Sequence, residues 1–285
     1  MKDVTNAMRA HILTAAVPYI KQYTDQYVVV KYGGNAMIDE ELKKSVMKDL
    51  MLLQLVGVKV VLVHGGGPAI NSTLDAMKIE SRFANGLRVT DEATMDVVQM
   101  VLAGKVNKGL VADLTDLGGK AVGLCGVDGN MIQVHKQNDE LGYVGSIDTI
   151  DTSIIDDVIS RGYIPVISSI GMGADGKTYN INADTVAAKI AGALKAETMV
   201  AMTNIDGVLR DVHDPSSLIS KITMAEADQL KAEGIIAGGM IPKVDCCLEA
   251  IKSGAQKVFI INGEIPHAIL IELLTDEGLG TMFVA

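Results

Sequence analysis

The stretch from residue 28 to residue 34 reads Val28-Val29-Val30-Lys31-Tyr32-Gly33-Gly34, and it sets the pattern for the whole chain. Three valines in a row suit a β-strand that is covered on both faces. The two glycines predict a turn at the carboxyl end of that strand, where the backbone can bend and a ligand can approach. A strand lysine can also extend into solvent at a sheet edge. Because Lys31 stands between apolar residues and glycines, we expect its ammonium group to lie in a crevice.

The alternation of short apolar runs with helical patterns continues along the chain. Runs rich in valine and isoleucine occur at 27–30, 58–63, 120–124, 164–168, 199–202 and 257–261. Patterns with helical spacing lie at 41–55, 91–103, 105–117, 151–161, 184–194, 224–233 and 242–253. This order predicts an α/β protein with a mostly parallel sheet between helical layers. Ligands of such sheets bind beyond the carboxyl ends of the strands.

Three segments depart from this alternation. Short polar and apolar alternations with glycine turns predict β-hairpins within 128–150 and 168–182. Residues 5–20 carry Met8, Ile12, Ala16 and Ile20 on one helical face, and Pro18 is expected to kink or end that helix. A helix that precedes the first core strand can pack on its own domain or on another subunit.

Composition excludes several classes of function. The 285 residues carry a net charge of −10, no tryptophan and 4% aromatic residues, which is a poor surface for nucleic acid. No apolar run is long enough for a membrane span, and no signal peptide is evident. The three cysteines (Cys125, Cys246 and Cys247) are odd in number and suit a reducing compartment. We therefore expect a cytoplasmic protein.

One stretch matches the P-loop expression G-x-x-x-x-G-K-[ST], namely Gly171 to Thr178. A P-loop places its lysine and threonine at the first turn of a helix. Here Lys177 and Thr178 precede residues that alternate like a strand, and Asp175-Gly176 is a favoured turn dipeptide. We interpret the stretch as a β-turn.

A second glycine cluster, His64-Gly65-Gly66-Gly67-Pro68, follows the apolar run at 58–63. Its backbone N–H groups can bind an anion at the carboxyl end of a strand. It lacks the third spaced glycine of a dinucleotide fingerprint. An esterase would need a G-x-S-x-G nucleophile elbow, which the sequence does not contain.

Three charged residues occupy positions that favour a ligand site. Lys243 follows Pro242, which suits the first position of a helix, and a lysine is unfavourable there unless an anion binds. Asp184 stands where a hairpin gives way to a helix, and alone it would serve as a helix-dipole partner. Arg88 is expected in a loop before a helix capped by Thr90, and alone it would be a surface residue.

Taken in order, these stretches resemble the amino acid kinase family over about residues 27–285. The Lys-Gly-Gly stretch marks the family broadly, and carbamate, aspartate and uridylate kinases share the family's architecture. The stretches at 83–91 and 180–184 are similar to members that phosphorylate N-acetyl-L-glutamate. The matching stretches are Lys31-Tyr-Gly-Gly-Asn-Ala-Met37, His64-Gly-Gly-Gly-Pro-Ala-Ile-Asn71, Phe83-Ala-Asn-Gly-Leu-Arg-Val-Thr-Asp91, Asn180-Ile-Asn-Ala-Asp184 and Gly238-Gly-Met-Ile-Pro-Lys243.

The resemblance implies transfer of the γ-phosphoryl group of ATP to the side-chain carboxylate of N-acetyl-L-glutamate, in arginine biosynthesis. It implies a three-layer αβα sandwich with a lobe for the amino acid and for dimerisation (23–190) and a lobe for ATP (191–285), after an oligomerisation helix (1–22). A carboxylate is already ionised at neutral pH, so this reaction needs no general base but must offset the repulsion between two anions. We expect Mg²⁺ with ATP, held mainly by phosphates.

The resemblance also implies roles for individual residues. Lys31 and Lys243 would reach the transferring phosphoryl group, with Asp184 holding both ammonium groups. Arg88 would bind the substrate α-carboxylate as a bidentate fork, and Asn180 its amide region and α-carboxylate. Backbone N–H groups at Gly33, Gly34, Gly66 and Gly67 would bind oxygens, and the nucleotide loop would use Thr203, Asn204, Asp206, Gly207 and Val208.

The N-terminal helix and residues 266–281 resemble the arginine-inhibited, hexameric members. This implies feedback inhibition by arginine at Tyr19, His267, Glu272 or Glu277, and a homo-oligomer that is at least a dimer and is expected to be a hexamer. Three other interpretations stay open, and one of them is a P-loop NTPase that would depend on Lys177. A related carbamate or glutamate kinase would differ at Arg88 and Asn180, and a regulatory protein without turnover would lack its catalytic lysines or aspartate.

Overall fold

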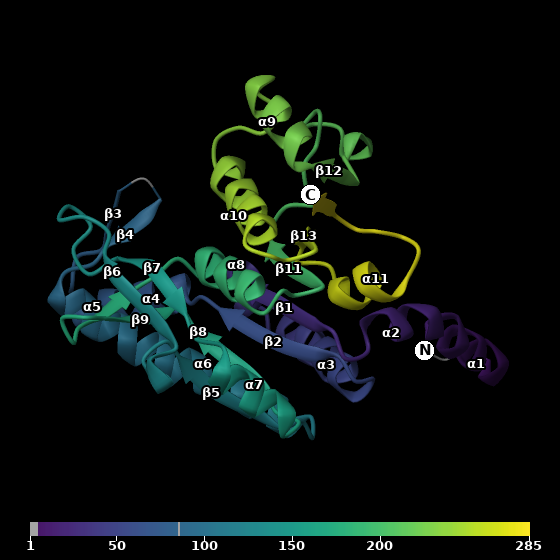
Figure 1. Cartoon of the computed structure of the whole chain (residues 1–285), viewed down its shortest axis with the longest axis horizontal. Coiled ribbons are helices and arrows are strands. Elements are labelled where there is room, and N and C mark those ends of the chain that lie inside the picture. The colour runs from purple at the N-terminus through teal and green to yellow at the C-terminus, as the bar shows by residue number, and fades with distance from the viewer. Residues whose placement is uncertain (1–4, 85) are drawn as a thin grey trace.

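The computed structural model describes residues 5–84 and 86–285, and its main sheet confirms all six predicted strands. The strand order is β12-β14-β13-β11-β1-β2-β8-β5, and every neighbouring pair is parallel except β13 and β14 (Figure 1). The strands are β1 (Tyr27–Tyr32), β2 (Lys59–His64), β5 (Ala121–Cys125), β8 (Ile164–Ser168), β11 (Thr198–Thr203), β12 (Lys221–Thr223), β13 (Lys257–Asn262) and β14 (Thr281–Val284).

The central strand β1 is buried on both faces, as its run of valines predicts. Successive side chains of a strand point to opposite faces. Val28 and Val30 accordingly enter one core cluster, whereas Val29 enters the other. Lys31 shares the face of Val29, which directs its side chain toward the helical layer that contains α8 (Ala183–Ala193).

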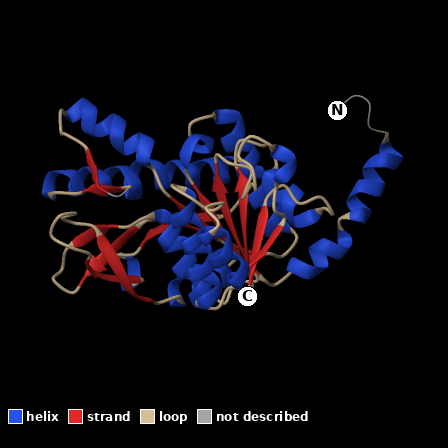
Figure 2. Cartoon of the chain, turned by 90° about the horizontal axis from the view of Figure 1, so that it is seen from above, coloured by secondary structure: helices blue, strands red, loops and turns tan. Residues whose placement is uncertain are grey.

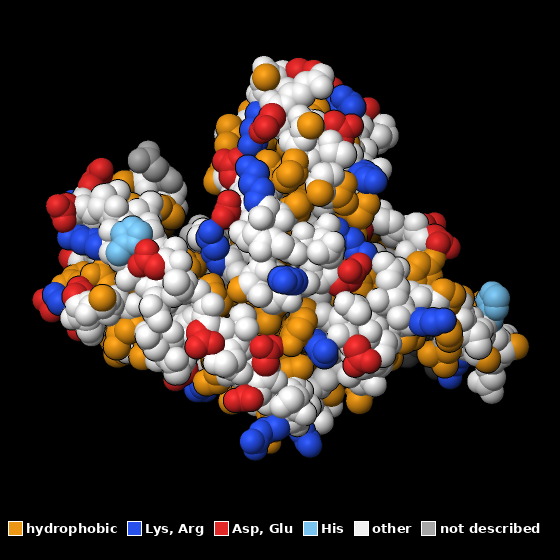
Figure 3. Space-filling model, in the orientation of Figure 1, with side chains coloured by type: hydrophobic (Ala, Val, Ile, Leu, Met, Phe, Trp, Pro, Cys, Tyr) orange, Lys and Arg blue, Asp and Glu red, His pale blue; other side chains and the backbone are white. Residues whose placement is uncertain are grey.

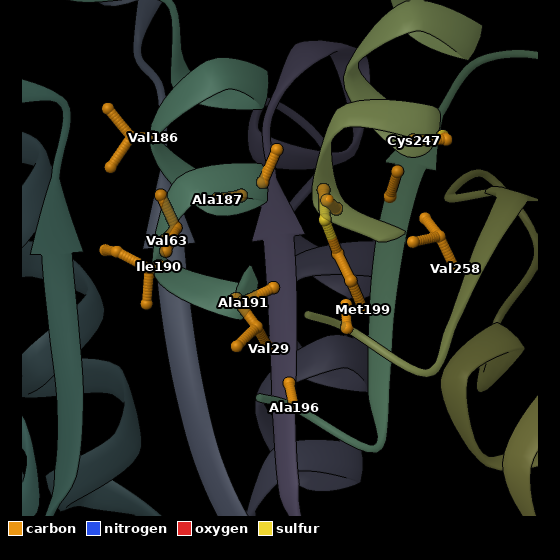
Figure 4. Close-up of a cluster of buried hydrophobic side chains, with 14 of the residues drawn as sticks. Val29, Val63, Val186, Ala187, Ile190, Ala191, Ala196, Met199, Cys247 and Val258 are labelled. Carbon is orange, nitrogen blue, oxygen red and sulfur yellow. The ribbon is translucent and has the colours of Figure 1, made fainter. Parts of the chain in front are cut away.

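Helices cover both faces of the sheet, so the chain is an αβα sandwich (Figure 2). The close-up in Figure 4 shows α8 lying over β1, with Ala191 near Val29. One layer contains α7 (Ser153–Ser160), α8, α9 (Met224–Ala232) and α10 (Met240–Lys252), and the other contains α2 (Val17–Tyr23), α3 (Glu40–Leu55), α6 (Asn107–Asp116) and α11 (Ala268–Leu274).

The two predicted hairpin regions form one small sheet beside the main one, in the order β10-β9-β6-β7. The P-loop-like stretch is a β-hairpin, because Gly173 N–H bonds the Lys177 carbonyl at 2.8 Å and Gly176 has a φ of 77°. A further hairpin pairs β3 with β4. The bounds are β3 (Arg82–Ala84), β4 (Leu87–Val89), β6 (Ile132–Lys136), β7 (Gly145–Ile150), β9 (Ile170–Gly173) and β10 (Thr178–Asn180).

The patterns at 91–103 and 105–117 are not two separate helices, as predicted, but one continuous helix. It runs through α5 (Glu92–Gln99), a π-helical segment η2 (Met100–Val106) and α6. The backbone stays helical across the junction, since Val106 has φ −71° and ψ −52°. Gly104 therefore lies inside the π-helical segment and does not end a helix.

The N-terminal helix is kinked as predicted, with α1 (Asn6–Ala15) followed by α2, and Pro18 in the first turn of α2. Helix α1 buries no residue and extends away from the body (Figures 1 and 2). Residues 1–4 of the predicted oligomerisation segment lie outside the described residues. The prediction missed α4 (Gly67–Met77). The short helical turns are η1 (Gly34–Met37), η3 (Asp128–Asn130) and η4 (Pro215–Ser217).

Within residues 5–84 and 86–285, no helix is both long and apolar enough to cross a membrane.

Candidate active site

The carboxyl ends of β1, β2 and β11 lie side by side at one edge of the main sheet, where the chain connections run in opposite directions from neighbouring strands. From β1 the chain passes to β2 on one side, and β11 lies on the other side. Ligands of open parallel sheets bind at such a switch point. Figure 3 shows a hollow in the surface. The β3–β4 hairpin and the small sheet lie on one side of it, and α9 and α10 lie on the other. This region is therefore the candidate site.

A cleft of about 590 Å³ lies on the small-sheet side of this point. It brings together four of the predicted site residues, Gly66, Gly67, Arg88 and Asn180, although they are far apart in the sequence. The apolar part of its lining comes from Ile70, Phe83, Leu87, Leu102, Val144, Ile181 and Ala183.

Lys31 and Asp184 form an ion pair, with 3.0 Å between Nζ and Oδ1. Their side chains are only 11% and 21% exposed. Asp184 lies in the first turn of α8, where the Asn182 side chain accepts bonds from the N–H groups of Asp184 and Thr185. A Cβ at position 33 would stand 3.4 Å from Lys31 Nζ, in ordinary van der Waals contact, so Gly33 lies directly beside the ammonium group.

Lys243 lies in α10, which packs beside α8. The helix begins at Met240, so the expectation that Pro242 would take the first helical position is wrong. Gly239 already has helical φ and ψ, which lets the helix start earlier. In the described part of the chain no ion pair within 4.0 Å joins Lys243 to Asp184. The Lys31 half of the expected two-lysine arrangement is thus present, and the Lys243 half stays a prediction.

The glycine loop after β2 has backbone N–H groups available for an anion. Gly65 N–H bonds the Tyr32 carbonyl at 3.0 Å and ties the loop to the end of β1. Gly66 precedes α4, whose first-turn N–H groups have no intrahelical acceptor. A Cβ at Gly66 would come within 2.6 Å of Leu102 Cδ2, so the close packing of the π-helical segment requires glycine here.

Arg88 is 7% exposed, and its guanidinium group contacts three other side chains. Nη2 donates to Asn71 Oδ1 at 2.6 Å, Nη1 donates to Ser81 Oγ, and the Phe83 ring lies 4.7 Å from the guanidinium carbon. Burial lowers the pKa of Arg88. Sequence reasoning missed these three partners, because nothing in the sequence places Asn71 and Ser81 beside residue 88.

The structure corrects the local setting of Arg88. It lies in strand β4 and not in a loop, and the helix after it is capped by Asp91, whose carboxylate accepts a bond from Thr94 N–H at 2.8 Å. Thr90 is buried and accepts a bond from Asn180 Nδ2 at 3.3 Å. Thr90 therefore links the β4 side of the cleft to β10. Asn85, part of the same sequence stretch, lies outside the described residues.

The predicted nucleotide loop follows β11, across β1 from the glycine loop. Thr203 ends the strand, and Asn204 and Asp206 are exposed. Asn262 Nδ2 donates to Asp206 Oδ1 at 2.8 Å, and Val208 N–H donates to Thr281 Oγ1 at 2.8 Å. Gly207 has a φ of 145°, and a Cβ there would meet Thr281 Oγ1 at 2.6 Å. The loop is therefore held by the ends of β13 and β14.

The four predicted arginine contacts gather around α11. Tyr19, on the adjacent α2, donates its hydroxyl to the Asp276 carboxylate. His267 Nδ1 lies 2.6 Å from Oδ1 of Asp49, and burial raises the pKa of that carboxyl to about 6.

The two predicted acidic groups differ in their surroundings. The Glu272 carboxylate accepts bonds from the N–H groups of Leu279 and Gly280, and burial raises its pKa. Glu277 is exposed. Glu272 thus already stabilises the loop that leads to β14.

Among residues 5–84 and 86–285, no group of three histidine, cysteine, aspartate or glutamate side chains could hold a metal ion. The three cysteines are free thiols, and burial raises the pKa of Cys246 to about 11.

Comparisons with known proteins agree on one family. The model of the amino acid kinase family matches residues 26–262. The acetylglutamate kinase of Brachyspira hyodysenteriae is 52% identical over 285 residues, covering 99% of each chain. That of Clostridium kluyveri is 54% identical over 275 residues, covering 96% of this chain and 97% of the relative. The solved N-acetylglutamate synthase of Neisseria gonorrhoeae, complexed with coenzyme A and N-acetylglutamate, superposes with a TM-score of 0.84 at 27% identity, covering 97% of this chain and 63% of the synthase.

Proposed function

The chain belongs to the acetylglutamate kinase branch of the amino acid kinase family, and we propose that it transfers the γ-phosphoryl group of ATP to the side-chain carboxylate of N-acetyl-L-glutamate. The observation that carries the proposal is the buried guanidinium of Arg88. It lines the cleft, two side chains orient it, and no carboxylate of the described residues pairs with it. Burying a charge without a counter-ion is unfavourable in free energy, so an anionic substrate group suits this position.

The residues around the cleft suit a reaction between two anions. Lys31 is held by Asp184 at the end of β1, where its positive charge would offset the repulsion between the carboxylate and the γ-phosphoryl group. Lys243 would act from the nucleotide side. The N–H groups of Gly33, Gly34, Gly66 and Gly67 would bind the equatorial oxygens. Asp184 is a positioning residue in this scheme, and no side chain is required as a general base.

The cleft also suits an acylated amino acid. Arg88 would bind the α-carboxylate, and Asn180 would bond the amide region. The apolar side chains of Leu87, Leu102 and Val144 would contact the acetyl methyl group. A free α-ammonium group would be desolvated there without a counter-ion, which disfavours glutamate itself as the acceptor.

ATP is proposed to bind on the other side of β1, in the lobe formed by residues 191–285. The loop with Thr203, Asn204, Asp206, Gly207 and Val208 would contact the nucleotide, and residues 23–190 would hold the amino acid. Mg²⁺ would be bound mainly by the phosphates. In this role Mg²⁺ neutralises charge on the β- and γ-phosphates.

The proposal also includes arginine biosynthesis in the cytoplasm, feedback inhibition by arginine, and a hexamer in which three dimers are joined by their N-terminal helices. Helix α1 exposes Met8, Ile12 and Leu13, which leaves an apolar stripe that the described residues do not cover. Deletion of residues 1–20 is expected to reduce the mass measured by light scattering and to weaken arginine inhibition. An unchanged mass and an unchanged arginine response would contradict this part of the proposal.

The activity is tested by measuring ATP consumption with N-acetyl-L-glutamate, glutamate, aspartate and carbamate side by side. N-acetyl-L-glutamate is expected to accelerate ATP consumption far more than the others, and the acceleration should disappear in Lys31→Ala. No acceleration by N-acetyl-L-glutamate would refute the assignment.

A further inference from the structure

A buried polar pair lies directly behind the glycine loop. His64 ends β2 and is fully buried, and Asn107 is 1% exposed. His64 Nδ1 lies 2.9 Å from the Gly65 carbonyl oxygen, and His64 Nε2 lies 3.0 Å from Asn107 Nδ2. The two ring nitrogens therefore face one backbone acceptor and one side-chain amide.

The neighbours of Asn107 fix which way its amide points. Nδ2 also faces the carbonyls of Val166 at 2.8 Å and Leu124 at 3.3 Å, whereas Oδ1 faces Lys108 Nζ at 3.2 Å. Nδ2 is thus a donor to His64 Nε2, because the lone pair of an amide nitrogen is delocalised into the carbonyl group and does not accept a hydrogen bond. His64 must then carry its proton on Nδ1, and it donates that proton to the Gly65 carbonyl.

The charge state of His64 agrees with this geometry. Burial lowers the pKa of His64 to about 4, so the ring is neutral at physiological pH. A neutral ring has one donor and one acceptor, and both are used here.

The bond to the Gly65 carbonyl has a consequence for the next N–H group. In a planar trans peptide the C=O and the following N–H point in opposite directions. Holding the Gly65 carbonyl toward His64 therefore turns Gly66 N–H away from His64, on the side where Gly65, Gly66 and Gly67 line the cleft. No acceptor among the described residues takes the Gly66 N–H.

The π-helical segment contributes to the same arrangement. Leu102 and Val106 of this segment pack against Gly66, and Asn107 follows immediately. Gly123 leaves the room that Asn107 needs, because a Cβ there would stand 1.8 Å from Asn107 Oδ1. Single π-turns inside α-helices are often found at functional sites.

We propose that His64 and Asn107 are positioning residues for phosphoryl transfer: Asn107 fixes the Nδ1–H tautomer of His64, and His64 locks the Gly65–Gly66 peptide with its N–H facing the reacting oxygens. The inference rests on the proposed function, since it deepens the role of the glycine loop. Neither side chain touches a substrate in this scheme.

Two substitutions at position 64 separate positioning from packing. In His64→Asn the amide nitrogen takes the place of Nδ1, so the bond to the Gly65 carbonyl is kept and the contact with Asn107 is lost. In His64→Gln the amide oxygen takes the place of Nε2 and can accept from Asn107 Nδ2, so the Gly65 bond is lost while more side-chain volume remains. Loss of an oxyanion donor costs roughly 100- to 1,000-fold in kcat, and a misdirected donor should cost about 10- to 100-fold.

We expect kcat to fall by about 10- to 100-fold in His64→Gln but by less than about fivefold in His64→Asn, with KM for ATP within about threefold of the unmodified value in both. The matched control His135→Gln changes an exposed histidine and should leave kcat unchanged. If packing alone mattered, the smaller asparagine would be the more damaging change. A kcat in His64→Asn as low as in His64→Gln would overturn the inference.

A measurement on the unmodified enzyme does not depend on the activity of these variants. Long-range ¹H–¹⁵N correlation spectra report the tautomer of each of the 5 histidines, and the His64 signals are those absent from His64→Asn. Protonation at Nδ1 is expected. Protonation at Nε2 in an enzyme that phosphorylates N-acetyl-L-glutamate would overturn this inference alone. Absence of that activity would overturn the proposed function and the inference with it.

Discussion

Replacing Asp184 with asparagine tests the ion pair at the centre of the site. The substitution keeps the shape and one acceptor oxygen of the side chain but removes the charge that faces Lys31 Nζ at 3.0 Å. Both side chains are mostly buried, at 11% and 21% exposure, so solvent screens this pair only in part. Lys31 is expected to lose its fixed position in the Asp184→Asn variant.

The magnitude follows from the strength of such a contact. A hydrogen bond to a charged group contributes about 1.5–3 kcal/mol. If that contribution is lost from the transition state, kcat falls by about 10- to 150-fold, since each 1.36 kcal/mol is a factor of ten. Because asparagine retains a hydrogen-bond acceptor, the free energy of unfolding should fall by only about 1–2 kcal/mol.

The assay is steady-state phosphorylation of N-acetyl-L-glutamate at saturating ATP, with urea unfolding measured on the same preparation. Glu249→Gln is the matched control. Glu249 lies in α10 and pairs at 2.6 Å with Lys189, which belongs to α8 as Asp184 does. Glu249→Gln should leave kcat within about twofold. A loss below about threefold in Asp184→Asn, or an equal loss in Glu249→Gln, would refute the reasoning.

Three further outcomes are expected. Arg88→Lys keeps the charge, but a lysine cannot bond Asn71 and Ser81 and also offer two parallel N–H groups to a carboxylate. KM for the acceptor should therefore rise by at least about tenfold in initial-rate measurements, with a smaller change in KM for ATP. Lys177→Ala changes an exposed hairpin turn and should leave kcat within about threefold, whereas a P-loop would lose nearly all activity in the same assay. The pKa of His64 is lowered in the folded protein, so as the pH falls below about 6.5 the unfolded chain takes up a proton before the folded chain does. The free energy of unfolding, measured by urea titration, should therefore fall between pH 7.5 and pH 5. This fall should be about 2 kcal/mol larger in the unmodified protein than in His64→Asn.

Much of the fold could be predicted because the information was local. The valine run of β1 predicts a strand buried on both faces, and the Asp175-Gly176 dipeptide predicts the hairpin turn that rules out a P-loop. Helix α4 was missed because its first residues, Gly67 and Pro68, suggest a loop, although proline is well suited to the start of a helix. The join between α5 and α6 was missed because Gly104 resembles a helix end.

The side chains of the candidate site were predicted mainly through the family resemblance. It implied that Asp184 holds Lys31, and the two residues form an ion pair. The partners of Arg88 come from a neighbouring helix and hairpin, so no sequence spacing indicates them. The pairing of His64 with Asn107 depends on the turn geometry of η2, which sequence periodicity does not report.

The π-helical segment changes what a difference in chain length between residues 100 and 106 would do. A π-turn holds one residue more than an α-turn, so deleting a single residue there would leave an ordinary α-helix with intact backbone bonding. In an ordinary α-helix, deleting one residue turns the following helix by about 100°, because there are 3.6 residues per turn. The wider π-turn absorbs one extra residue, so a deletion confined to residues 100–106 would leave Asn107 facing His64. Loss of one residue should therefore be tolerated better in this segment than in α5 or α6 on either side of it.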